Sequence, residues 1–231
     1  RFTLTTAPGE RNDITLTVYP STGARLTDAA AGVVAGPGCV VNAGELRCVP
    51  PPGDYPEVHL PASIDLGEGD DRLVLRTTSL YYNRVANEPA TLVVHGGPGA
   101  DDLDLGIDKW IPDGGPGPDI MRARTITYAD RTAPVTAIDD GLANDGEAGE
   151  GDDVRASTYN SNPVQLHVIG GRGDDHLAGD IVEGGDGDDD IVTRWQADGG
   201  AGNDVLSAAP VMTVGRVELI GGPGDDRLTG G

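Results

Sequence analysis

Short runs of alternating apolar and polar residues make up much of this chain. The opening segments FTLTTA and DITLTVYP alternate in this way, and Gly, Pro, Asn and Asp separate such runs from one another. Alternation with a period of two is typical of a β-strand that has one buried face. No segment shows the 3.6-residue period of an amphipathic helix. The sequence therefore predicts an all-β protein with very little helix.

A Gly-rich octapeptide recurs along the chain with the pattern G-G-x-G-x-D-x-U, in which U is apolar. Successive copies start 30, 18, 34, 22, 14, 15 and 22 residues apart. Such repetition is the signature of a chain whose turns stack on one another. The short steps predict single coils, and the two longest steps predict either two coils or one coil with a loop. Six copies are complete, at 96–103, 114–121, 170–177, 184–191, 199–206 and 221–228, and two are degenerate, LGEGDDRL at 66–73 and AGEGDDVR at 148–155.

Each position of the repeat suits a calcium site between stacked turns. Glycine permits a positive φ, so the chain can turn tightly and direct its carbonyl groups to one point. The Asp at position 6 adds a carboxylate, and calcium takes six to eight oxygens of these two kinds. One turn supplies part of that shell, and the next turn, about 4.8 Å away, supplies the rest. Magnesium is disfavoured because it dehydrates reluctantly and requires strict octahedral geometry.

The charge of the chain agrees with a cation ligand. Its 38 acidic and 16 basic residues give a formal net charge of −22. Such a chain repels nucleic acid and anionic membranes, so we expect neither as a partner. Stacked acidic turns would also repel one another without cations, so we expect folding to depend on calcium. No apolar run approaches the roughly 20 residues of a membrane-spanning helix.

Two cysteines, Cys39 and Cys48, flank the turn residues Asn42-Ala43-Gly44. A hairpin about this turn could bring the two sulfur atoms within bridging distance. A disulfide there fits an oxidising compartment, and two unpaired thiols are the alternative.

The repeat resembles the RTX, or haemolysin-type, calcium-binding nonapeptide, and the segments around it look like modules of secreted actinobacterial calcium-binding proteins. The resemblance implies a right-handed parallel β-helix or β-roll solenoid with calcium ions between successive coils. Regular RTX coils carry two nonapeptides per turn, whereas here the other half-turn has a different sequence, so we expect one main ladder of ions. The implied carboxylate ligands are Asp71, Asp101, Asp119, Asp153, Asp175, Asp189, Asp204 and Asp226. The implied turn glycines are Gly171, Gly173, Gly185, Gly187, Gly200, Gly202, Gly222 and Gly224.

The expected organisation is one continuous solenoid. Residues 1–65 lack the repeat and are expected to form N-terminal β coils or a cap, with the Cys39–Cys48 disulfide. Residues 66–231 are expected to form the RTX-like calcium-binding part.

The sequence favours a structural role over catalysis. It contains neither the HExxH zinc motif nor the G-x-S-x-G nucleophile elbow, and its acids follow the repeat. We therefore expect a secreted or cell-surface calcium-binding module, not an enzyme, that serves adhesion or end-to-end assembly into filaments. Its candidate partners besides calcium are a second copy of the chain and an extracellular glycan. The alternatives are the repeat tail of a larger secreted enzyme and a carbohydrate-active β-helix.

Two features outside the repeat stay open at this point. The acidic stretch 139–154 could hold a further calcium ion through Asp145, Glu147 or Glu150, or it could be a solvated loop. The aromatic side chains Tyr81, Tyr82, Trp110 and Trp195 could stack on a ligand or pack in the interior, and we expect His176 at the surface.

Overall fold

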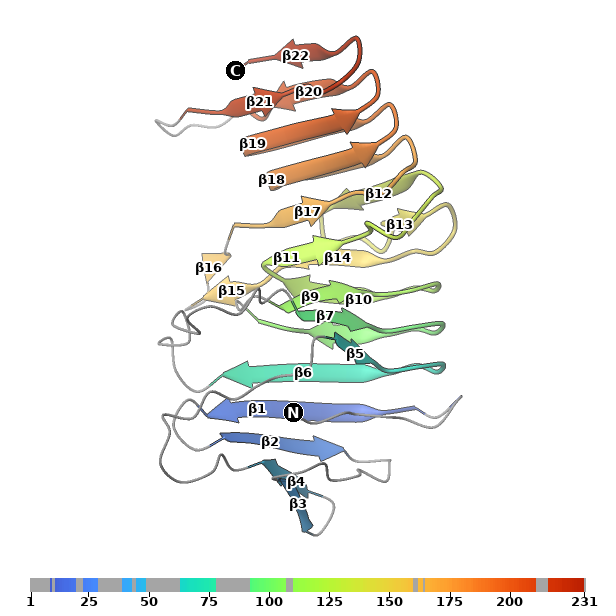
Figure 1. Ribbon diagram of the computed structural model, residues 1–231, viewed down its shortest axis with the longest axis vertical. Helices are drawn as coiled ribbons and strands as arrows, with labels where there is room; N and C mark the ends of the chain where they lie inside the picture. Colours follow the sequence, from blue (N-terminus) through green and yellow to red (C-terminus); the bar gives the residue numbers. More distant parts are fainter. Residues whose placement is uncertain are drawn as a thin grey trace.

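The structure is a computed structural model. It describes residues 9, 11–19, 23–28, 39–42, 45–48, 63–77, 92–106, 110–159, 162–163, 165–210 and 216–230. Every regular element among these residues is a β-strand. The described part of the chain therefore has no helix that could cross a membrane. The strands lie one above another along the long axis of the molecule, from β3 and β4 at one end to β22 at the other (Figure 1).

One parallel stack runs through the N-terminal half. Each strand adds one apolar side chain to the same column, because position 8 of the repeats at 66–73, 96–103 and 114–121 occupies the same register, with Ile14 and Val154 beside it at the two ends. The column consists of Ile14, Leu73, Leu103, Met121 and Val154, all of which are buried. The strands of this stack are β1 (Asp13–Tyr19), β6 (Arg72–Thr77), β8 (Asp102–Asp104), β10 (Ile120–Ala123) and β14 (Asp153–Ala156).

A second parallel stack runs through the C-terminal half, and it buries two apolar columns. One column contains Leu177, Ile191 and Leu206, and the other contains Val168, Val182 and Ala197. The strands of this stack are β11 (Thr125–Thr127), β12 (Val135–Ile138), β17 (His167–Ile169), β18 (His176–Asp186), β19 (Asp190–Ala201), β20 (Val205–Ala208), β21 (Glu218–Ile220) and β22 (Arg227–Thr229).

The other described strands form smaller sheets or short pairings. A parallel three-stranded sheet contains β5 (Ser63–Asp65), β7 (Leu92–His95) and β9 (Trp110–Asp113). The strand β13 (Gly146–Glu147) pairs antiparallel with β12, and β15 (Thr158–Tyr159) pairs antiparallel with β16 (Asn162–Pro163).

The N-terminal strands extend the first sheet in antiparallel order. Strand β1 pairs on one side with β6, in parallel, and on the other with β2 (Gly23–Asp28). Next come β4 (Glu45–Cys48) and β3 (Cys39–Asn42), which form the hairpin predicted from the sequence. Cys39 and Cys48 lie directly opposite each other in its register, while the disulfide itself stays a prediction.

The predicted single right-handed β-helix solenoid is wrong. The described strands form four separate sheets, and five of their pairings are antiparallel. The physical reason is the uneven spacing of the turns. Arg72 pairs directly with Asp102, so that 30-residue step is one turn with an insert. The 34-residue step contains β12, which leaves the first sheet and pairs with β18 in the other.

Candidate metal centre

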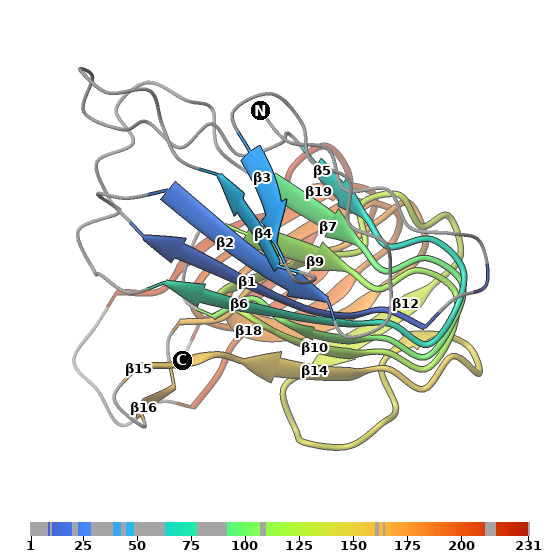
Figure 2. The same ribbon diagram turned by 90° about the horizontal axis from the view of Figure 1, so that it is seen from below.

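The Gly-rich turns stack along one side of the molecule, where they superpose in the view along the long axis (Figure 2). Glycine is required there by close approach as well as by a positive φ. A Cβ atom at Gly97, which has a φ of +99°, would lie 1.9 Å from the Gly67 carbonyl oxygen. A Cβ at Gly200, with a φ of +98°, would lie 1.9 Å from the Gly185 carbonyl oxygen. The predicted turn glycines therefore form columns of closely packed backbone.

The residues at position 6 form a hydrogen-bonded column that we call the Asp ladder. The Oδ1 atom of each Asp accepts the backbone N–H of the equivalent residue in the preceding turn. The Asp101 N–H donates to Asp119 at 2.9 Å, and the Asp175 N–H donates to Asp189 at 2.8 Å. In the first stack the ladder contains Asn12, Asp71, Asp101, Asp119 and Asp152; in the second it contains Asp175, Asp189, Asp204 and Asp226.

In several members of the Asp ladder, the second carboxylate oxygen has no hydrogen-bond partner. The Oδ2 atoms of Asp101, Asp119, Asp189 and Asp204 are buried and accept no hydrogen bond within the described residues. Each lies against the first glycine of its own repeat; a Cβ at Gly114, for example, would lie 2.2 Å from Asp119 Oδ2. A buried carboxylate with an unpaired oxygen costs free energy unless a proton or a cation compensates it.

The electrostatics of the Asp ladder follow from this burial. Burial raises the pKa of Asp119 to about 8, although the hydrogen bond from the Asp101 backbone opposes the rise. Burial likewise raises the pKa of Asp101 and of Asp189 to about 7, and neighbouring ladder carboxylates raise both further. These acids thus favour either a proton or a compensating positive charge.

A pH dependence follows for the calcium-free protein. The raised pKa values of Asp101, Asp119 and Asp189 lie above the unfolded value near 3.9, so the folded state holds more protons between about pH 4 and pH 8. The melting temperature in calcium-free buffer is therefore expected to fall as the pH rises through this window. Asp119→Asn is expected to make the melting temperature depend less on pH. A melting temperature that rises with pH would contradict the raised pKa values of these three acids.

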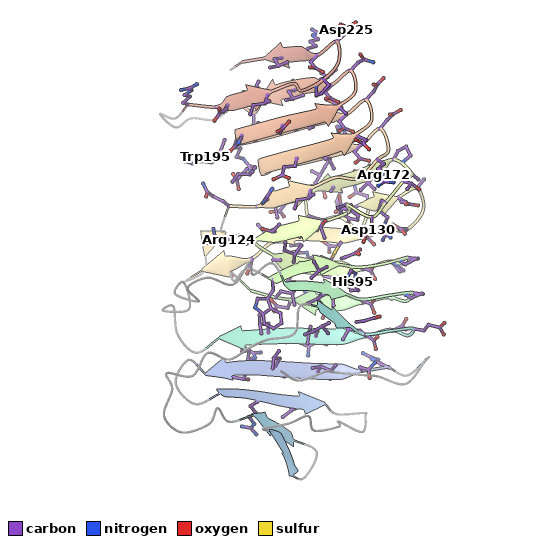
Figure 3. The ribbon with its side chains drawn as sticks, in the orientation of Figure 1. His95, Arg124, Asp130, Arg172, Trp195 and Asp225 are labelled. Atoms are coloured by element: carbon purple, nitrogen blue, oxygen red, sulfur yellow. The ribbon has the colours of Figure 1, made fainter. Side chains whose placement is uncertain are left out.

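A second, solvent-exposed column runs beside the Asp ladder in the opposite direction. At position 5, a side-chain oxygen accepts the N–H of the following turn: Asp174 from Asp188 at 2.9 Å, and Asp188 from Asn203 at 2.7 Å. Asn203 in turn accepts the N–H of Asp225 at 3.0 Å, and Asp225 lies at the end of this column (Figure 3). Position 5 therefore contributes to stacking from the solvent side.

The structure shifts one predicted site residue by one position. The repeat predicts Asp153 as the position-6 carboxylate of its turn, but Asp152 is the residue that accepts the Asp119 N–H, at 2.9 Å. Asp153 instead lies in β14 opposite Ile120 and pairs with Arg155. The signal was available in the sequence, because Val154, and not Arg155, is the apolar residue that position 8 requires. The other predicted position-6 residues all occupy the ladder.

Asn12 is a member of the ladder that the repeat pattern does not predict. Its backbone N–H and its Nδ2 both donate to Asp71 Oδ1, at 2.7 and 2.8 Å. Ile14 follows two residues later and fills the position-8 column beside Leu73. Asn12 thus begins the ladder with a neutral side chain, in a turn that lacks the paired glycines by which the repeat is recognised.

The acidic stretch 139–154 is held by the protein's own donors. Asp145 is buried, and its two oxygens accept the backbone N–H groups of Ile138 and Val154, at 2.8 and 2.9 Å. Both carboxylate oxygens of Asp145 therefore accept hydrogen bonds, and Asp145 links β12 to β14. Glu147 and Glu150 lie about 4 Å from the guanidinium of Arg131.

The remaining predicted features divide between core and surface. Trp110 is buried, whereas Trp195 is 49 % exposed and lies on the side away from the Gly-rich turns (Figure 3). His176 is at the surface, as predicted, and lies 3.2 Å from Asp190. Tyr81 and Tyr82 lie outside the described residues.

The Asp ladder fits an oxygen-liganded cation only if backbone carbonyls complete the shell. Among the described residues, no three His, Cys, Asp or Glu side chains gather into a metal-binding group. The turns that carry Asp71, Asp101, Asp119, Asp152, Asp175, Asp189 and Asp204 each contribute one buried carboxylate, and glycine carbonyls of the Gly-rich turns pack directly on the next turn. Calcium accepts such a mixture of carboxylate and carbonyl oxygens, whereas zinc prefers nitrogen and sulfur ligands.

Comparison with known proteins adds no relative. No protein-family model matches the chain, and no curated protein and no solved structure shows significant similarity to it.

Proposed function

We propose that this chain is a calcium-binding structural protein whose stacked Gly-rich turns are stabilised by Ca²⁺ along the Asp ladder. The observation that carries the proposal is the set of buried, unpartnered Oδ2 atoms of Asp101, Asp119, Asp189 and Asp204. Natural proteins rarely leave such oxygens unsatisfied, and a bound ion is one of the standard ways in which they are compensated.

The residues that would hold the ion are the ladder carboxylates and the carbonyl groups of the turn glycines. When bound, calcium would neutralise carboxylates that otherwise repel one another from turn to turn. Besides burial, repulsion from Asp152 and Asp101 raises the pKa of Asp119, and repulsion from Asp71 raises the pKa of Asp101. The glycines bring the backbones of successive turns into close contact, and this contact supports the proposal that carbonyl groups of two turns would contribute to one ion.

Location and partners extend the same proposal. We propose a secreted or cell-surface protein without catalytic activity, since calcium at extracellular concentrations can saturate sites with dissociation constants of about 10⁻⁴–10⁻³ M. The ladder acids support a structural role because their Oδ1 atoms hold the backbone of neighbouring turns. A second copy of the chain and an extracellular glycan stay predictions as partners.

Calorimetric titration of the chelated protein with calcium tests the proposal. We expect several bound ions per chain and a rise in melting temperature with calcium that magnesium at the same concentration does not reproduce. Absence of calcium uptake, with an unchanged melting temperature, would refute it.

A further inference from the structure

A turn without the glycine repeat lies between the two parts of the Asp ladder. The Val135 N–H donates to Asp175 Oδ1 at 2.8 Å, as the Asp175 N–H donates to Asp189 in the next turn. The Arg131 carbonyl accepts the Arg172 N–H at 3.0 Å, as the Gly171 carbonyl accepts the Asp186 N–H at 3.1 Å. Arg131 therefore occupies position 2 of this turn, and Val135 occupies position 6. Compared with a Gly-rich turn, this turn has Val135 in place of the ladder carboxylate and Arg131 in place of the second glycine.

The guanidinium of Arg131 is surrounded by oxygen atoms of the kinds that calcium binds. Its Nη2 donates to the Gly115 carbonyl at 2.5 Å and lies 3.9 Å from Glu150 Oε1. Its Nε lies 4.0 Å from Glu147 Oε1. The side chains of Arg131 and Glu150 are only 13 % and 15 % exposed. A turn carbonyl and two carboxylates thus converge on one largely buried positive charge.

The ladder carboxylate at this level is also satisfied from within the protein. Asp152 Oδ1 accepts the Asp119 N–H, as elsewhere in the ladder, but its Oδ2 accepts the hydroxyl of buried Tyr128 at 2.9 Å. The Arg131 charge further lowers the pKa of Asp152 and so offsets part of the rise that burial causes. The equivalent oxygens of Asp119 and Asp189 have no such donor among the described residues.

Glycine makes room for this arrangement. A Cβ at Gly146, where φ is +86°, would lie 2.7 Å from Asp152 Oδ2 and 2.8 Å from Glu150 Oε2. The loop between β12 and β14 can therefore bring the carboxylates of Glu150 and Asp152 close to Arg131. We call this region, where the first and second parallel stacks meet, the joint.

We infer that this joint is a cation site that the protein fills with its own guanidinium, so that Arg131 holds the two stacks together without metal. Removing Arg131 would leave an oxygen-lined site open to a divalent cation that prefers oxygen ligands. This second part rests on the proposed function, since it assumes that calcium binds along the rest of the ladder.

Arg131→Gln tests the inference, with Arg172→Gln as the matched control because Arg172 is an exposed arginine on the adjoining turn (Figure 3). In calcium-free buffer, we expect hydrogen exchange at residues 119–135 and 145–154 to accelerate at least tenfold in Arg131→Gln and to stay unchanged in the control. In calcium, we expect protection to return and titration to count one more bound ion than in the wild type. Arg131→Lys keeps the charge and is expected to bind the wild-type number.

Three outcomes would overturn the inference. These are unchanged exchange in calcium-free Arg131→Gln, an ion count equal to that of the wild type, and failure of Arg131→Gln to fold even in calcium. Failure of the proposed function is distinguishable, because the wild type would then bind no calcium. In that case, hydrogen exchange in calcium-free buffer alone would decide whether Arg131 holds the two stacks together.

Discussion

Replacing Gly200 with alanine is expected to destabilise the C-terminal stack by about 2–5 kcal/mol. The new Cβ would lie 1.9 Å from the Gly185 carbonyl oxygen, on backbone with a φ of +98°. The left-handed conformation costs a non-glycine residue about 1–2 kcal/mol, and overpacking costs about 1–3 kcal/mol more. Urea denaturation in calcium-containing buffer measures the change, and hydrogen exchange should show that the loss centres on β18, β19 and β20.

Gly149→Ala is the matched control, because Gly149 has nearly the same φ, +95°, but a Cβ there would meet no atom within 4 Å beyond its chain neighbours. It should cost only the conformational term of about 1–2 kcal/mol. Equal effects of the two substitutions would mean that the turns do not pack as closely as the structure shows.

Asp189→Asn is expected to change the stability in opposite directions with and without calcium. Asparagine keeps an oxygen for the Asp175 N–H but removes the negative charge whose Oδ2 is unpartnered. In calcium-free buffer at pH 8, where Asp189 is mostly ionised, the variant should therefore be more stable than the wild type by about 1 kcal/mol or more. In calcium it should be less stable by about 1–3 kcal/mol, because a charged ligand is lost.

Asp186→Asn removes the same charge from an exposed position of the same turn and serves as the control. We expect it to change stability by less than about 0.5 kcal/mol in either buffer. Thermal denaturation of the three proteins with calcium and with chelator measures the reversal. Destabilisation of Asp189→Asn by the same amount in both buffers would assign the carboxylate a purely structural role.

The repeat predicted the local structure of the turns well, because its glycines and apolar position act through the backbone and the core. Leu103 and Met121 lie in register as position 8 requires, and Asp101 and Asp119 follow one another in the ladder. The same rule, applied strictly to Val154, would have placed Asp152 in the ladder.

The overall architecture was less predictable, because segments between the repeats decide which strands pair. The sequence of residues 1–65 lacks the Gly-rich repeat, and β2, β4 and β3 add in antiparallel order. Nothing local in the sequence shows that Val135 and Arg131 belong to a turn of the stack, because neither matches the repeat. Asn12 could not be predicted for the same reason, and only its hydrogen bond to Asp71 reveals that it begins the ladder.

An anomalous difference map from crystals grown in calcium is the most direct test of calcium binding along the Asp ladder. If calcium binds there, we expect peaks between successive turns, about 2.3–2.6 Å from the Oδ2 atoms of Asp101, Asp119, Asp189 and Asp204. A map without peaks there, in crystals whose Gly-rich turns stack as described, would contradict it.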